Sequence, residues 1–150
     1  MIAKKFMLVD DDIDDTELFT EAVESVDASV KCLNAGHGAD ALAKLYSKDY
    51  RKPDLIFLDI NMPVMNGWQF LSRIKDDEEL KEIPVIVYST SSNATDFRTA
   101  LASGALCFFT KPNSFATLKN VLRIVLEHMN NDDLDKVCDA IHQAFKYRKN

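Results

Sequence analysis

Short apolar runs alternate with amphipathic helical patterns along the chain, and this alternation restricts the fold more than any other feature. The run Leu55–Leu58 has four large apolar residues between turn formers, the pattern of a strand that is buried on both faces. Five such alternations predict a parallel sheet covered by helices on both sides. The expected strands are Phe6–Val9, Val30–Asn34, Leu55–Leu58, Val85–Tyr88 and Leu106–Phe109.

Capping signals support the helices between these strands. Asn93 and Ser114 stand before helical patterns as N-terminal caps, and Gly104 follows the fourth pattern as a stop signal. Right-handed crossovers leave few topologies, and a doubly wound five-stranded α/β sheet is the natural one. We therefore predict one domain over residues 1–129.

A further amphipathic pattern lies at the end of the chain. Its apolar stripe consists of Leu134, Val137, Cys138, Ile141 and Phe145. Acidic residues precede the stripe and basic residues follow it, which suits the helix dipole. Residues 130–150 are therefore predicted to form a helical extension, and its stripe is buried either on the chain's own core or in a dimer.

Composition narrows the classes of function. The formal net charge of −6 argues against nucleic-acid binding, which needs clustered Lys and Arg. No apolar stretch approaches the roughly 20 residues that span a bilayer, and the first residues lack a secretory signal. Cys32, Cys107 and Cys138 have no metal-ligand spacing and are expected to be reduced thiols of a cytoplasmic protein.

Polar side chains follow four of the five expected strands. They are Asp10, Asp11 and Asp12 after the first, Asp59 after the third, Ser89 and Thr90 after the fourth, and Lys111 after the fifth. Because the carboxyl ends of parallel strands meet at one edge of a sheet, these side chains are expected to share a crevice. Clustered carboxylates call for a cation, and oxygen ligands on rigid loops suit Mg²⁺. A neighbouring lysine and hydroxyl would stabilise a phosphoryl group, so the pattern indicates phosphoryl chemistry on a carboxylate.

Four segments carry these residues: Phe6–Asp11, Leu58–Gly67, Pro84–Ser89 and Gly104–Pro112. In this order they resemble the response-regulator receiver domain of two-component signalling, the CheY-like family, from Lys5 to about Glu127. The resemblance implies a flavodoxin-like sheet with strand order 2-1-3-4-5.

The resemblance also implies roles at the crevice. Asp59 is the expected phosphoacceptor. It would hold Mg²⁺ together with Asp10, Asp11 and the backbone carbonyl of Asn61. Lys111 would bind the phosphoryl group.

Further positions match the family's switch and its structural residues. Ser89 is the expected switch hydroxyl, in place of the more frequent Thr, and Phe108 is the expected aromatic switch residue. Thr90 occupies a position where a smaller residue is common. The structural positions are Pro63, Gly67 and Pro112, the last one expected after a cis bond from Lys111.

The resemblance implies a stand-alone response regulator or phosphorelay receiver. Its expected partners are a histidine kinase or histidine phosphotransfer protein and a downstream protein, with no nucleic acid or membrane. It is not expected to be an enzyme beyond gaining and losing its own phosphoryl group.

Two other readings stay open. Asp12–Thr16 fits the Asp-x-Asp-x-Thr pattern of haloacid-dehalogenase-type phosphatases, and the final helix could make the chain a mainly dimeric interaction module. Asp14 and Asp15 are expected to complement the start of the first helix rather than touch metal. The sequence does not decide whether Asp12 is a residue of the acidic loop or a ligand of the metal.

Overall fold

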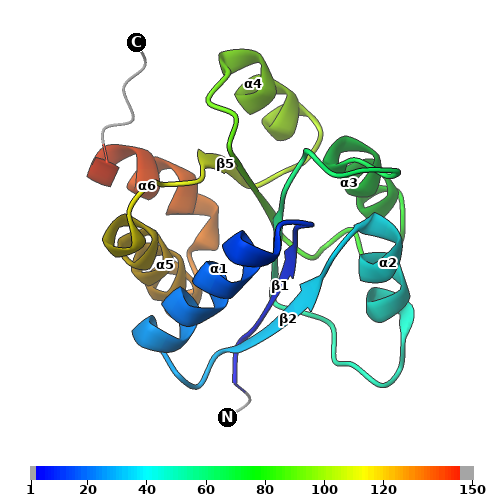
Figure 1. Cartoon of the computed structure of the whole chain (residues 1–150), viewed down its shortest axis with the longest axis horizontal. Helices are drawn as coiled ribbons and strands as arrows, with labels where there is room; N and C mark the ends of the chain where they lie inside the picture. The colour runs from blue at the N-terminus through cyan, green and yellow to red at the C-terminus, as the bar shows by residue number, and fades with distance from the viewer. Residues whose placement is uncertain (1–2, 146–150) are drawn as a thin grey trace.

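The computed structural model of the chain describes residues 3–145, and its strands form one parallel sheet (Figure 1). The strands are β1 (Lys5–Val9), β2 (Lys31–Ala35), β3 (Leu55–Leu58), β4 (Val85–Ser89) and β5 (Cys107–Thr110). Their order across the sheet is β2-β1-β3-β4-β5, and all neighbouring pairs are parallel. The predicted doubly wound sheet is confirmed, and each predicted strand lies within one residue of the observed one.

Helices follow every strand. They are α1 (Ile13–Val26), α2 (Gly38–Tyr46), α3 (Gly67–Lys75), α4 (Ala94–Ala102), α5 (Phe115–Asn130) and α6 (Val137–Phe145), the last preceded by a 3-10 turn at Leu134–Lys136. The predicted caps are confirmed, because the side chain of Asn93 accepts the Asp96 N–H and that of Ser114 accepts the Thr117 N–H. Gly104 has a φ of 99° just after α4. No helix in the described part of the chain is both long and apolar enough to cross a bilayer.

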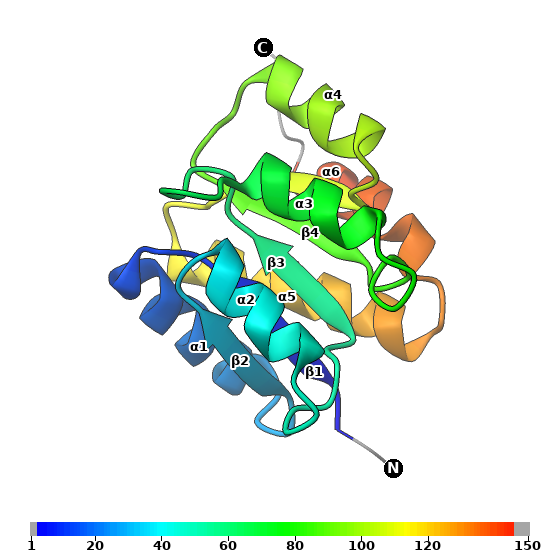
Figure 2. The ribbon, with the colours of Figure 1, turned by 90° about the vertical axis from the view of Figure 1, so that its right-hand side faces the viewer.

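Side chains alternate between two cores, one on each face of the sheet. Phe6 and Leu8 of β1 belong to the core under α1 and α5, whereas Met7 and Val9 belong to the core under α2, α3 and α4. This is the period-two pattern of a strand that is buried on both sides. In Figure 2, α2 and α3 cover the near face of the sheet and α5 lies behind it. Both faces are therefore closed, and the loops at the strand ends are left to carry chemistry.

The C-terminal stripe packs against the rest of its own chain. Val137 and Ile141 are fully buried in the core that α5 covers, and Leu134, Cys138 and Phe145 pack against that core. This is the first of the two burial sites that the sequence allowed. The helix is shorter than predicted within the described residues, and positions 146–150 lie outside them.

A disulfide between Cys107 and Cys138 contradicts the prediction of three reduced thiols. The packing of α6 beside β5 brings the two Cα atoms to 5.1 Å, inside the range of about 4.4–6.8 Å that disulfides require. Their separation of 31 residues gave no local signal of this contact. Cys32 is a free, half-buried thiol, and burial raises its pKa to about 11.

Gly67→Ala is expected to destabilise the fold by about 2–3 kcal/mol, as overpacking of a rigid site does. A Cβ at this position would lie 2.5 Å from the Asp59 carbonyl oxygen and 2.5 Å from the Ile60 Cα atom, and backbone atoms cannot swing aside. Denaturant unfolding of the variant measures the loss.

The matched control is Gly36→Ala, because a Cβ there meets nothing within 4 Å. Its free energy of unfolding is expected to stay within about 0.5 kcal/mol of the parent value. Equal losses in the two variants would contradict the close packing of α3 against the end of β3.

Candidate functional site

The buried polar residues of the described chain gather at one edge of the sheet. Asp10, Asp59 and Ser89 are the only polar or charged residues in the range 3–145 that are classed as buried. Each lies at or just after the carboxyl end of a strand, as predicted. Burying a carboxylate is costly unless it is paired, so this position demands a compensating charge.

Backbone hydrogen bonds fix these residues to neighbouring strands. The Asp10 N–H donates to the Ala35 carbonyl at 3.0 Å, and the Asp59 N–H donates to the Val9 carbonyl at 2.9 Å. The Lys111 N–H donates to the Ser89 carbonyl at 2.7 Å. The sheet ladder thus continues past the strand ends, which holds the carboxylates and the lysine in register.

Lys111 is the counter-charge of the cluster. Its ammonium group donates to Asp10 Oδ2 and to Asp15 Oδ2, at 2.7 Å each, and lies 4.0 Å from Asp59 Oδ2. The same nitrogen lies 5.5 Å from the ring centroid of Tyr88, which is a cation–π distance. One cation therefore serves three carboxylates.

Burial and charge shift the pKa values of this group. Burial raises the pKa of Asp59 to about 6, although Lys111 pulls it down. Burial likewise raises the pKa of Asp10, against its hydrogen bond with Lys111. Burial alone would lower the pKa of Lys111, but its hydrogen bonds with Asp10 and Asp15 raise it above the ordinary value. The lysine thus stays charged while the carboxylates are short of positive charge.

The three carboxylates among the predicted metal ligands lie together. One carboxylate oxygen from each of Asp10, Asp11 and Asp59 falls within 4.8 Å of the others, with Asp11 exposed to solvent. Hard oxygen donors with an open, solvated side match the needs of Mg²⁺ better than those of a softer metal. The Asn61 N–H donates to Asp59 Oδ1 at 3.2 Å, which places Asn61 directly beside the Asp59 carboxylate.

The predicted switch residues belong to β4, the residue after it, and β5. Ser89 Oγ accepts the Ser91 N–H at 3.3 Å and lies 3.5 Å from Asn61 Nδ2. Thr90 is exposed, so its side chain faces solvent rather than the core. Phe108 is 3% exposed, and its ring centroid lies 6.0 Å from that of Phe97 in α4.

The structural residues of the site differ from expectation in one respect. The Gly67 N–H donates to the Ile60 carbonyl at 3.1 Å and closes the loop after β3, while Pro63 lies exposed within that loop. The expected cis bond between Lys111 and Pro112 is wrong, because residues 3–145 contain no cis peptide. Trans is the more stable form of an X–Pro bond by about 0.5–1 kcal/mol unless a tight turn imposes cis.

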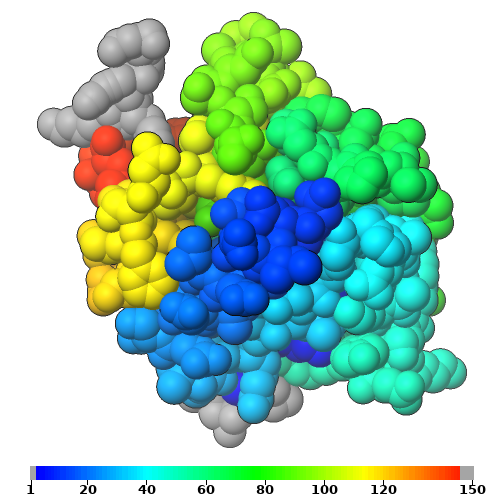
Figure 3. Space-filling model, in the orientation of Figure 1, coloured from blue at the N-terminus to red at the C-terminus, as the bar shows by residue number. Residues whose placement is uncertain are grey.

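The start of α1 lies beside the cluster, and it contains Asp12, which could be either a loop residue or a metal ligand from the sequence alone. The side chain of Asp12 accepts the Asp15 N–H at 3.1 Å as the N-cap of α1, and it is not one of the grouped metal ligands. Asp14 is exposed in the first turn, as predicted. In Figure 3 this dark blue turn lies between cyan α2 and the yellow start of α5.

The sequence did not predict the contacts that two residues of the site make with Lys111. The sequence predicts only that Asp15 complements the helix dipole, whereas its carboxylate accepts a hydrogen bond from Lys111. Tyr88 was read only as a strand residue, yet its ring underlies the same ammonium group, and burial raises its phenol pKa. The position of Asp15 in the first turn of α1, a helix that begins beside the carboxylate cluster, could have suggested this contact.

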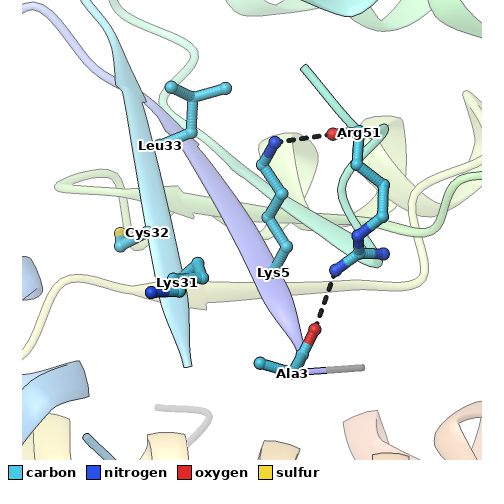
Figure 4. Close-up of a pocket in the computed structure, with 6 residues that line it drawn as sticks. All are labelled: Ala3, Lys5, Lys31, Cys32, Leu33 and Arg51. Carbon is cyan, nitrogen blue, oxygen red and sulfur yellow. Dashed lines mark hydrogen bonds between the residues drawn. The ribbon is translucent and has the colours of Figure 1, made fainter. Parts of the chain in front are cut away.

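A hollow lies away from the carboxylate cluster, around the first residues of β1 and β2 (Figure 4). Its lining residues are Ala3, Lys5, Lys31, Cys32, Leu33 and Arg51. Lys5 Nζ donates to the Arg51 carbonyl at 2.6 Å, and Arg51 Nη2 donates to the Ala3 carbonyl at 2.8 Å. These cations are engaged by the backbone, and the hollow is separate from the carboxylate cluster.

Comparison with known proteins identifies the arrangement. The family profile described as the response regulator receiver domain matches residues 6–123. The response regulator Rcp1 of Synechocystis sp. is 31% identical over 126 residues, which cover 81% of this chain and 84% of Rcp1.

Solved structures agree with this match. The phosphorylated cyanobacterial phytochrome response regulator RcpA superposes with a TM-score of 0.78 at 30% identity, covering 87% of this chain and 96% of RcpA. The Mn²⁺-bound form of Rcp1 gives a TM-score of 0.74 at 28% identity, covering 84% and 94%.

Asp59→Asn is expected to stabilise the metal-free protein at pH 7.5 by about 1–3 kcal/mol. The folded-state pKa of about 6 lies above the unfolded value near 3.8, so the native state holds the proton more tightly. Native stability therefore falls as the pH rises from about 4 to about 6, and the variant lacks this loss. Denaturant unfolding in a chelator at pH 4 and pH 7.5 measures the difference.

Asp49→Asn serves as the control, because Asp49 is an exposed carboxylate remote from the cluster. Its effect on the free energy of unfolding is expected to be small at both pH values. If Asp59→Asn changed stability by the same amount at both, the raised pKa would be refuted.

Proposed function

The chain belongs to the response regulator receiver domain family, and from that premise we propose that Asp59 accepts a phosphoryl group from a histidine kinase or a histidine phosphotransfer protein. One observation carries the proposal. Asp59 is a buried carboxylate with Lys111 at 4.0 Å on one side and the carboxylates of Asp10 and Asp11 on another. That is the charge arrangement a transferred phosphoryl group needs around its acceptor.

The transfer itself is a displacement at phosphorus. A carboxylate oxygen of Asp59 forms the new P–O bond while the P–N bond to the donor imidazole breaks, and the imidazole leaves with the bond's electron pair. With a pKa of about 6, Asp59 is mostly ionised at neutral pH and so carries the lone pair for attack. Its N–H contact from Asn61 keeps Oδ1 oriented in the crevice.

Asp10, Asp11, Asp59 and the backbone carbonyl of Asn61 are the residues that we propose to hold Mg²⁺. When bound, this ion would neutralise charge on the phosphoryl oxygens. The Mn²⁺-bound form of Rcp1 supports a divalent ion in this family. The grouped oxygens of the three carboxylates support its position here.

Lys111 supplies the second counter-charge. In the unphosphorylated chain its ammonium group is divided between Asp10 and Asp15. A phosphoryl group on Asp59 adds nearly two negative charges, which would draw the ammonium group toward it. Lys111 therefore senses the charge state of Asp59 directly.

We propose that the response spreads through Ser89 and Phe108. The Ser89 hydroxyl already lies beside Asn61 at the crevice, and on phosphorylation it would donate to a phosphoryl oxygen. Phe108 would move into the space that this shift vacates. The face formed by α4, β5 and α5 would then differ for a downstream protein partner.

The chain would act as a phosphoacceptor rather than as an enzyme on external substrates. Residues 1–129 would form the receiver domain, and residues 130–150 would form an extension of it. The role of the extension is taken up below.

Treatment with a small acyl phosphate donor and Mg²⁺ is expected to add one phosphoryl group to the parent chain and none to Asp59→Asn. The amide keeps the shape of the side chain but is not a nucleophile. Intact-protein mass spectrometry, before and after hydroxylamine, measures the adduct and its acyl phosphate character.

Asp14→Asn is the matched control, because Asp14 is an exposed carboxylate in the neighbouring first turn of α1. It is expected to be phosphorylated like the parent chain. An adduct that persists in Asp59→Asn would show that another residue is the acceptor.

Asp11→Asn is expected to weaken Mg²⁺ binding by at least roughly tenfold, because it removes one of the few charged ligands. Asp11 is exposed, so the fold should survive the change. Titration calorimetry with MgCl₂ measures the affinity, with Asp14→Asn again as the control. Unchanged affinity in Asp11→Asn would remove this residue from the metal site.

A further inference from the structure

The disulfide joins β5, a strand at the edge of the sheet, to helix α6, which lies beside it. β5 is an edge strand that pairs only with β4. Cys107 opens β5 and is fully buried, whereas Cys138 is the second residue of α6 and is half-buried. The bond therefore connects the edge strand directly to the last described helix.

Helix α6 lies beside β5 and contacts α5 (Figure 1). Val137 and Ile141 pack into the core under α5. On the other side, the ring centroid of His142 lies 5.2 Å from that of Phe97 in α4. Phe97 in turn packs on Phe108. α6 thus covers the free side of β5 between α4 and α5.

Helix α6 is short and has few fully buried residues. α6 has nine residues, a length at which an isolated helix is marginal in water. Only Val137 and Ile141 are fully buried among its residues. A covalent link across 31 residues removes much of the freedom that the undocked segment would gain.

We propose that Cys107 and Cys138 form a reversible thiol–disulfide site that locks α6 over β5, and that its reduction releases the helix. A partner that approaches between α4 and α5 would meet α6 in the oxidised chain and β5 in the reduced chain. This inference goes beyond phosphoryl transfer and does not depend on it.

The proposed reductant is a dithiol, either a small molecule or a dithiol protein. Its thiolate attacks Sγ of Cys138, the more accessible sulfur, and the S–S bond breaks to leave Cys107 as a thiolate that takes up a proton. The second thiol of the reductant then displaces Cys138, which also takes up a proton. The products are two protein thiols and one disulfide of the reductant, so two electrons are transferred.

The test compares the full chain after treatment with oxidised glutathione and after treatment with dithiothreitol, both without a phosphodonor. Alkylation in denaturant is expected to label only Cys32 in the first sample and all three cysteines in the second. Amide hydrogen exchange over residues 137–145 is expected to be faster by about a hundredfold in the reduced protein. The amides of β5 are expected to follow in the same direction.

Two variants separate the lock from a general effect of reductant. Cys138→Ser should exchange like the reduced parent in both treatments, and Cys32→Ser should respond like the parent because that thiol is outside the pair. Three labelled cysteines after oxidation, or equal exchange of α6 in the two states, would overturn the proposal. So would stoichiometric Zn²⁺ in the untreated protein, since Sγ of Cys107 and Cys138 and a ring nitrogen of His142 also lie within 4.8 Å of one another.

Discussion

A single ammonium group holds the functional edge of this protein together. Lys111 comes from the end of β5, yet it binds Asp10 after β1 and Asp15 in α1, about a hundred positions away in the sequence. Breaking such a buried pair by removing one partner leaves an uncompensated charge, which is far more costly than losing a surface ion pair. The ammonium group of Lys111 therefore links the loop after β5 to the loop after β1 and to the start of α1.

The same arrangement leaves the site short of positive charge. Three carboxylates share one lysine, and burial keeps the pKa of Asp59 well above its ordinary value. The deficit costs stability in the metal-free state, and a cation or a more favourable charge distribution relieves it. Stability and the proposed phosphoryl acceptance thus oppose each other at this edge. The hydrophobic cores on both faces compensate for the loss.

Local sequence patterns were enough to predict what depends on local physics. The apolar runs gave strands such as Leu55–Leu58, capping residues such as Asn93 gave helix starts, and parallel topology brought Asp10 and Asp59 to one edge. Two of the misses depend on three-dimensional packing. The Asp15–Lys111 pair requires the exact rotation of α1 against β5, and the disulfide requires the docking of α6. Neither arrangement has a signature within a few residues of the sequence.

Helix α6 of the extension is joined to β5, the strand that carries the proposed switch residue Phe108. Phe108 is a buried aromatic residue of β5, Phe97 packs on it from α4, and His142 of α6 packs on Phe97. Cys107, the next residue to Phe108, carries the covalent link to the same helix. A displacement of Phe108 therefore cannot be isolated from α6, because close-packed side chains transmit volume changes to their neighbours. The proposed displacement of Phe108 and the disulfide at Cys107 both act on β5, a strand of four residues. A change at the carboxylate cluster and a change in the docking of α6 therefore affect the same strand.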